Sequence, residues 1–195
     1  MNTQTPSSMN LVFGLLALSL NCALLVVAPQ AVAQKPHYSQ AGLQYFNQRL
    51  DDLRCRQDGL VIDGSLDLNG DWFALASLAD SSGDRACGST AISAGGGYRA
   101  AFDETFDMYA SLRFETISPD VGERDSGLIF VGGLRGFIAQ DIEGTLELAH
   151  QTIFDGSTTI SAGSAFWFTR EFAATTGLTL SSNGTTITLG ARMNF

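Results

Sequence analysis

Few side chains in this sequence have the types and spacing that catalysis needs. The chain has two histidines, and His37 lies near the N-terminus, outside any patterned segment. His150 shares the apolar parity of Leu146 and Leu148, and Ser164 lies on a similar parity in the following segment. A histidine base beside a serine nucleophile would indicate a hydrolase. The simpler interpretation is a histidine without a catalytic partner, so we expect no enzymatic activity.

Cysteines are the candidates for a covalent link. Cys22 lies inside an apolar run and follows Asn21, which makes a poor lipoprotein signal. Cys55 and Cys87 are the two cysteines beyond that run, and both lie in polar segments. In an oxidising compartment these two can form a disulfide.

Three acidic groups could hold a divalent cation, although such residues are usually only solvated: Asp51 with Asp52, Asp80 with Asp84, and residues 120–125. No Cys and His spacing typical of a metal site occurs, and the glycines at 95–97 precede no helix, as a phosphate-binding loop would. We therefore expect no cofactor and no metal. The net charge of -9 argues against nucleic acid as a partner.

Residues 1–33 have the pattern of a secretory, helical signal peptide. An apolar run over 11–27 is followed by Ala31-Val32-Ala33, a small-residue cleavage site. Residues 1–10 contain no Lys or Arg, which departs from the usual pattern. An uncleaved anchor is the alternative, but the run is short for one. The sequence predicts cleavage after Ala33, a short leader over 34–40 and one domain over 41–195.

From residue 60 onward, apolar and polar residues alternate as in β-strands. Leu60, Ile62, Leu66 and Leu68 share one parity, and an Asn69-Gly70 hairpin signal follows. The unit of strand, tight turn and strand recurs, with tight turns expected at 69–71, 102–105, 140–141 and 169–171, and longer loops at 80–88 and 118–125. Segment 41–53 alternates poorly. We expect about ten strands if it is one of them, with eight as the alternative.

Charged residues in these segments gather on the parity opposite to the apolar one: Asp63, Asp67, Arg99, Arg113, Glu115, Arg135, Glu143, Glu147 and Arg192. If the apolar face meets lipid, these charges line a lumen, because a lipid-facing Arg near the bilayer midplane costs about 2 to 4 kcal/mol. Only 16% of the residues are charged. The chain therefore lacks the surplus of charged side chains that would solvate the outer face of a soluble barrel. The sequence predicts an all-β fold, a single up-and-down antiparallel transmembrane β-barrel. A soluble exported β-sandwich is the alternative, because its strands also alternate.

With this pattern the chain resembles the small outer-membrane β-barrel proteins of Gram-negative bacteria, including the OmpA-type and opacity-type barrels. The resemblance rests on the signal peptide, the G-Y-R and G-L-R strand ends and the closing L-G-A-R-M-N-F, and it covers residues 59–195. It implies outer-membrane lipid as the surroundings and the barrel-assembly machinery as a partner. It assigns the assembly signal to Leu189, Ala191, Met193 and Phe195, with Met193 where such proteins often have an aromatic residue.

A barrel of this size is about filled by its own side chains, so we expect a largely plugged, polar lumen. The predicted function is structural or in surface adhesion and interaction, through acidic extracellular loops. A narrow porin-like channel is the main alternative, and a barrel lipid hydrolase is a lesser one. Ten strands would place Cys55 and Cys87 on neighbouring loops at one rim, where a disulfide would staple them. We expect a monomer.

Overall fold

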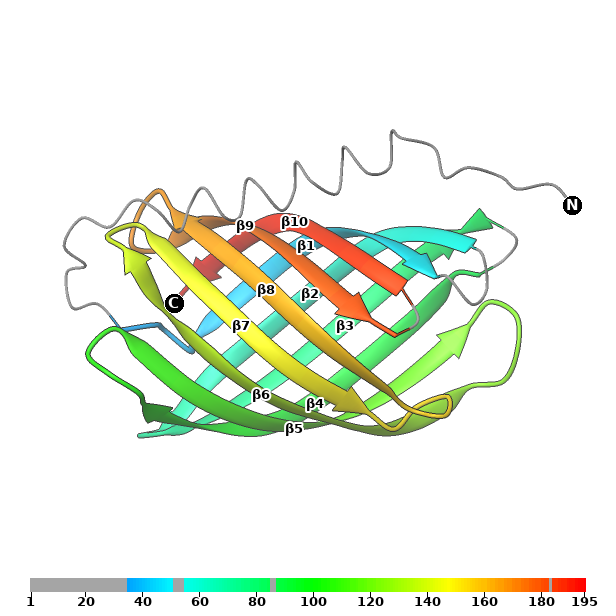
Figure 1. The fold of residues 1–195 in the computed structure, drawn as a ribbon, viewed down its shortest axis with the longest axis horizontal. Coiled ribbons are helices and arrows are strands. Elements are labelled where there is room, and N and C mark those ends of the chain that lie inside the picture. Colours follow the sequence, from blue (N-terminus) through cyan, green and yellow to red (C-terminus); the bar gives the residue numbers. More distant parts are fainter. Residues whose placement is uncertain (1–34, 51–54, 85–86, 183) are drawn as a thin grey trace, which may run out of the picture.

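The chain folds into a closed β-barrel in which each strand runs antiparallel to its neighbours (Figure 1). The structure, a computed structural model, describes residues 35–50, 55–84, 87–182 and 184–195. The strands in chain order are β1 Gln40–Leu50, β2 Cys55–Asn69, β3 Trp72–Gly83, β4 Ser89–Ala101, β5 Phe106–Pro119, β6 Asp125–Ala139, β7 Ile142–Gln151, β8 Ser157–Trp167, β9 Phe172–Ser181 and β10 Gly184–Asn194. The predicted fold class is confirmed, with ten strands, and the alternative of eight is wrong. The expected signal peptide and its cleavage site lie outside the described residues.

The first and last strands close the barrel. β1 pairs with β10 from Gln40 opposite Asn194 to Leu50 opposite Gly184, and its other edge pairs with β2. Residues 41–50 of the segment with the poorest alternation in the sequence therefore belong to the sheet, and residues 51–53 lie outside the described residues. Closure leaves no strand edge unpaired, which is what a β-structure inside a bilayer requires.

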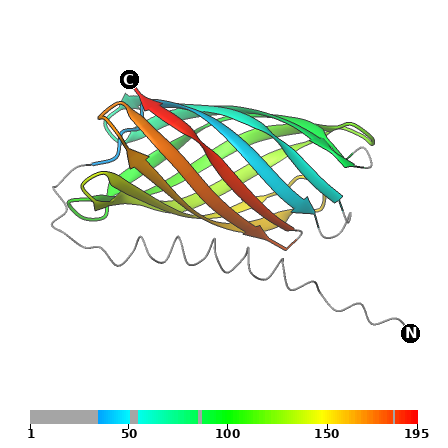
Figure 2. The same ribbon diagram turned by 90° about the horizontal axis from the view of Figure 1, so that it is seen from above.

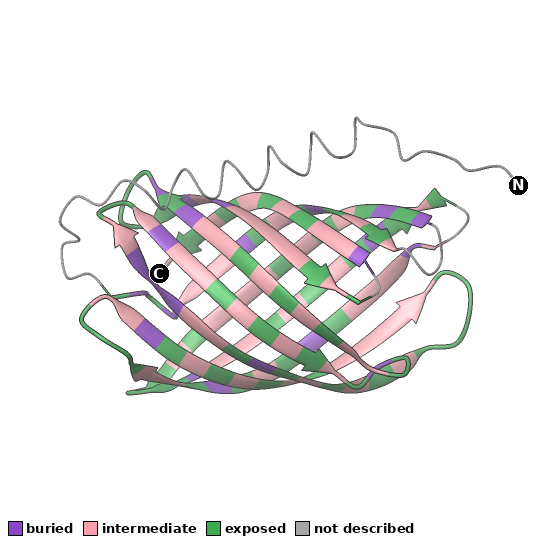
Figure 3. Ribbon diagram, viewed as in Figure 1, coloured by how far each residue is buried: buried purple, intermediate pink, exposed green. Residues whose placement is uncertain are grey.

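Outward-facing side chains form an apolar band around the barrel. On β10, for example, Ile187, Leu189 and Met193 point outward and are 49%, 64% and 39% exposed. Figure 3 shows more and less exposed residues alternating along the strands, as the pleat of a β-strand dictates. A continuous apolar outer face is the surface that lipid covers in a transmembrane barrel. Among the described residues, there is no helix that is long and apolar enough to cross a bilayer.

Some apolar residues face inward, which explains where the sequence pattern was ambiguous. Phe46 on β1 and Phe73 on β3 are buried on the inner face. Ile129 and Val131 on β6 also point inward, with Val131 4% exposed. The lumen is thus not uniformly polar, and alternation fails in the sequence at these positions.

The two ends of the barrel differ. One end carries the tight turns that follow β2, β4, β6 and β8, together with the C-terminus and the start of β1 (Figures 1 and 2). Aromatic pairs lie at this end, with ring centroids 5.1 Å apart for Trp72 and Tyr98 and for Phe166 and Phe168. Aromatic girdles of this kind mark the boundary between lipid and water. We call this the turn end and the opposite one the loop end.

Candidate functional site in the lumen

The inward faces of the strands bring the predicted lumen charges together. All nine lie on the inward parity, and they are buried or half-buried: Asp63, Asp67, Arg99, Arg113, Glu115, Arg135, Glu143, Glu147 and Arg192. Asp107 on β5 shares this parity and is 3% exposed. The inner face therefore carries ion pairs in place of an apolar core, and these pairs concentrate at the turn end.

Glu143 on β7 is the centre of the charge network at the turn end. Arg135 Nε donates to Glu143 Oε1 at 2.6 Å, and Arg135 Nη2 donates to Glu143 Oε2 at 3.2 Å. Arg192 Nη1 from β10 also donates to Glu143 Oε1, at 2.8 Å. Glu143 is 1% exposed, so one carboxylate compensates two guanidinium groups that are largely removed from water. The same Arg135 Nη2 donates to Gln40 Oε1 at 2.8 Å, which ties β6 to the start of β1.

A second set of ion pairs lies beside the first. Arg99 Nη2 donates to Asp67 Oδ2 at 2.9 Å, and Arg99 Nη1 lies 3.9 Å from Asp107 Oδ2. Lys35 Nζ lies 3.5 Å from Asp107 Oδ1. Lys35 belongs to the segment that precedes β1, so this segment takes part in the network. From the sequence, residues 34–40 are expected only to form a short leader.

Tyr38 is the functional residue that sequence reasoning missed. Its side chain is 3% exposed, with Arg99 Cζ 4.4 Å and Arg135 Cζ 5.1 Å from the ring centroid. Guanidinium groups at these distances from a tyrosine ring make favourable cation–π contacts. The ring of Tyr38 also packs against Phe73, with centroids 4.9 Å apart, and against Tyr109, with centroids 6.5 Å apart.

Backbone contacts hold the segment around Tyr38 in place. Ser65 Oγ donates to the carbonyl oxygen of Tyr38 at 2.7 Å. The Asp67 N–H donates to Ser39 Oγ at 3.2 Å, and the Phe195 N–H donates to the carbonyl oxygen of Ser39 at 3.1 Å. The segment 35–39 therefore enters the turn end of the barrel and fills it together with the charge network.

The middle of the lumen is not filled. A cavity of about 360 Å³ begins at Tyr38 and Phe73, and its wall includes Asp63 and Arg192. A second cavity of about 220 Å³ lies nearer the loop end, among residues that include Glu115 and Gln151. The two cavities share these lining residues: Arg113, Glu147 and Ser161. The two cavities therefore lie one after the other between the filled turn end and the loops, and their walls combine hydroxyl, amide and charged groups with apolar side chains.

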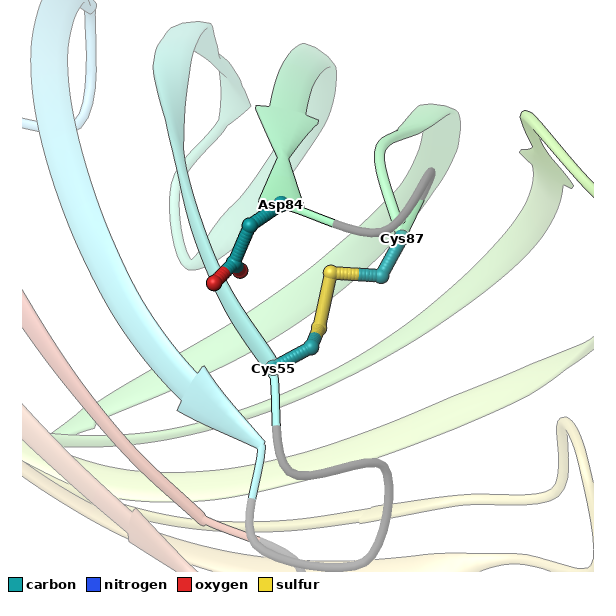
Figure 4. A group of neighbouring side chains, drawn as sticks. All are labelled: Cys55, Asp84 and Cys87. Carbon is teal, nitrogen blue, oxygen red and sulfur yellow. A yellow bond between two sulfur atoms is a disulfide. The ribbon is translucent and has the colours of Figure 1, made fainter.

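At the loop end, Cys55 and Cys87 are joined by a disulfide with a Cα–Cα distance of 6.7 Å. Asp84 lies beside this link (Figure 4), and its Oδ1 accepts a hydrogen bond from the Arg56 N–H at 2.9 Å. Over the described ranges, Cys55, Asp84 and Cys87 are the three residues whose potential metal ligands lie within 4.8 Å of one another. Both sulfur atoms are used by the disulfide and offer no thiolate, so the group is not a metal site.

The acidic loop residues that the sequence offered as cation ligands have other contacts. Asp80 Oδ1 accepts a hydrogen bond from Thr90 Oγ1 at 2.8 Å. Asp125 Oδ2 accepts one from the Phe154 N–H at 2.7 Å, which links two neighbouring loops. Asp51 and Asp52 lie outside the described residues.

The candidate hydrolase pair is not brought together. His150 Nδ1 lies 3.0 Å from Thr158 Oγ1 at the loop end. Ser164 is paired in register with Gly144 and Thr176, six residues further along β8 from Thr158. At about 3.3 Å per residue this separation is roughly 20 Å, too long for a nucleophile and its base. His37 is exposed at the turn end.

Comparison with known proteins yields similarity in structure only. No protein-family model matches the sequence, and no curated protein matches it. The KdgM porin in complex with oligogalacturonate has 11% identity and a TM-score of 0.49, covering 79% of this chain and 99% of that one. An outer membrane channel from Pseudomonas putida F1 has 12% identity and a TM-score of 0.49, covering 87% of this chain and 100% of that one. The Yersinia pestis outer membrane protein Ail has 12% identity and a TM-score of 0.42, covering 80% and 99%.

These proteins are outer-membrane β-barrels, and what each carries or binds is a property of that protein. What this chain shares with them is the fold, a closed antiparallel β-barrel. Its own architecture, with an apolar outside and a charged inside, is suited to a bilayer.

Proposed function

We propose that this protein is a non-enzymatic barrel of the bacterial outer membrane whose lumen is closed to ions at rest and whose outer loops contact partners at the cell surface. The observation that carries the proposal is the filled turn end. There the guanidinium groups of Arg99 and Arg135 lie over the Tyr38 ring, and the ion pair of Glu143 with Arg192 adds to the closure.

Export and assembly belong to the same proposal. The signal peptide would be cleaved after Ala33, which places residues 35–39 close to the new N-terminus. Leu189, Ala191 and Met193 point outward on β10, and Phe195 follows at the turn end. An outward apolar row that ends on an aromatic residue supports the proposal that the barrel-assembly machinery reads this strand. The strand contacts in the structure need no second chain, which supports a monomer.

The loop end supports a role in contacts with a basic partner surface. Its described residues include seven acidic ones, Asp58, Asp80, Asp84, Asp120, Glu123, Asp125 and Asp155, and three basic ones, Arg49, Arg56 and Arg124. The disulfide between Cys55 and Cys87 fixes part of this rim. A fixed acidic rim favours partners of opposite charge and steers their approach, an effect that salt weakens.

Planar bilayer recordings test the closed lumen. Purified, refolded protein should add no discrete conductance steps, while its faster gel migration before boiling shows that the barrel has formed. Reproducible steps from the unmodified protein would overturn the proposal.

The second candidate function is a narrow porin-like channel that is open at rest. The observation in its favour is the pair of adjacent cavities between Tyr38 and the loops, which share three lining residues. The same recordings decide between the two functions, because an open channel would conduct without any change to the chain.

A further inference from the structure

The groups that close the turn end are attached to the barrel in two different ways. Phe73, Tyr109, Arg135 and Arg192 are on strands β3, β5, β6 and β10, and each of these strands is hydrogen-bonded to a neighbour on both sides. Tyr38 precedes β1 and belongs to no strand. It can leave the lumen without breaking the sheet.

Within the described ranges, the contacts that hold Tyr38 and its neighbours are few and individually weak. They are two cation–π contacts, ring contacts with Phe73 and Tyr109, three hydrogen bonds at Tyr38 and Ser39, and the ion pair of the half-exposed Lys35. The Tyr38 hydroxyl has no hydrogen-bond partner within the described part of the chain. The segment is therefore held mainly by the ring of Tyr38, and the phenol oxygen adds little.

The inner space ends on this ring. The 360 Å³ cavity is lined by Tyr38, and beyond it toward the loops lies the second cavity. The ion pairs of Arg99 with Asp67 and of Arg135 with Glu143 link side chains of the barrel wall to one another and not to Tyr38. They can stay in place when the ring moves away.

We propose, building on the closed resting barrel argued above, that residues 35–39 form a tethered plug and that the protein is a latent, cation-selective channel that conducts when Tyr38 leaves the lumen. The selectivity follows from the charges on the inner face. Six carboxylates, Asp63, Asp67, Asp107, Glu115, Glu143 and Glu147, face four guanidinium groups, Arg99, Arg113, Arg135 and Arg192. Carboxylate excess along a narrow path favours cations, and the acidic loop end raises their local concentration.

The test compares full-length variants refolded into planar bilayers in potassium chloride. Tyr38→Ala removes the ring, whereas Tyr38→Phe keeps it and removes only the unpartnered hydroxyl. His37→Ala changes an exposed neighbour in the same segment. We expect steady conductance steps from Tyr38→Ala alone, with a reversal potential in a salt gradient on the side of cation preference.

Each other outcome has a defined meaning. Silent bilayers with correctly folded Tyr38→Ala would refute the plug, and so would equal conductance from Tyr38→Phe. Anion preference would refute the selectivity. Conductance from the unmodified protein would instead refute the closed resting state on which the plug rests. If Tyr38→Ala fails to fold, as judged by gel migration before boiling, a chain with residues 35–39 replaced by five Gly and Ser residues makes the same comparison.

Discussion

Replacing Glu143 by glutamine should destabilise the barrel more than any comparable change in the lumen. The carboxylate accepts hydrogen bonds from Arg135 at 2.6 and 3.2 Å and from Arg192 at 2.8 Å, and it is 1% exposed. Glutamine has nearly the same shape but carries no charge, so two guanidinium groups lose their shared counter-charge. Removing one partner from a buried ion pair costs about 3 to 5 kcal/mol. We expect Glu143→Gln to fall in that range, which corresponds to a factor of more than about 100 in the folding equilibrium.

The assay is a urea titration of the protein folded into phospholipid vesicles, followed by the gel migration of unboiled samples. Glu115→Gln is the matched control, because Glu115 also points inward but lines the cavity near the loops and lies outside the ion pairs of the turn end. A carboxylate that solvent can reach contributes about 1 kcal/mol or less. If the two variants lose similar amounts of stability, Glu143 does not organise the turn end and the reasoning is wrong.

Three further predictions concern the inner and outer faces of β10, the disulfide at the loop end and the turn between β4 and β5. Arg192→Leu should lower refolding yield more than Met193→Leu, since Arg192 pairs inside the lumen and Met193 faces outward; equal yields would mean that the faces are misassigned. Cys55→Ser with Cys87→Ser should lower stability by about 2 to 4 kcal/mol in urea titrations, and mass analysis after alkylation should find no free thiol in the unmodified protein. Backbone N–H groups of the β4–β5 turn hydrogen-bond to the Asp103 carboxylate and lower its pKa. Asp103→Ala should therefore reduce stability at neutral pH. This difference should begin to shrink as the pH falls below about 4, the ordinary pKa of an aspartate, and vanish only below the lowered pKa of the folded state, where the carboxyl is protonated in both the folded and the unfolded protein.

The sequence predicted the strands well where one face meets lipid and the other meets polar groups. On β2 the outward residues are apolar and the inward ones include carboxylates: Leu60, Ile62 and Leu66 point outward, and Asp63 and Asp67 point inward. The two-residue period can therefore be read directly from the amino-acid sequence. Lipid imposes this period because a charge on the outer face is costly. The tight turns and the number of strands follow from the same alternation.

The pattern fails where the inner face is itself apolar. Phe137, Ala165, Trp167 and Ala173 form a buried cluster near the turn end, and Val131, also buried, lies six residues before Phe137 on β6. At such positions both faces of a strand carry apolar residues, and the sequence cannot say which face is outside. Only the pairing of β6, β7, β8 and β9 fixes the direction of these side chains.

The role of Tyr38 was beyond the reach of the sequence for a different reason. Its partners Arg99, Arg135 and Phe73 lie on three different strands, which closure of the barrel brings to one place. No local pattern reports such a contact. The sequence does contain one modest indication of this role. Tyr38 is an aromatic residue close to Lys35 and directly before the first strand, in a segment that otherwise has no apolar face.

The need for a plug follows from the number of strands. An eight-stranded barrel is about filled by its own inward side chains, and the interior widens as strands are added. With ten strands, the small inward residues of β8 and β9, such as Ser161, Gly163 and Gly177, leave the 360 Å³ cavity unfilled. At the turn end the ion pairs occupy the wall, and the remaining space at the centre is filled by a ring from outside the sheet. In this ten-stranded barrel the space at the centre of the turn end is occupied by Tyr38 from an added segment, and that is why a change at Tyr38 should affect conductance while leaving the strands intact.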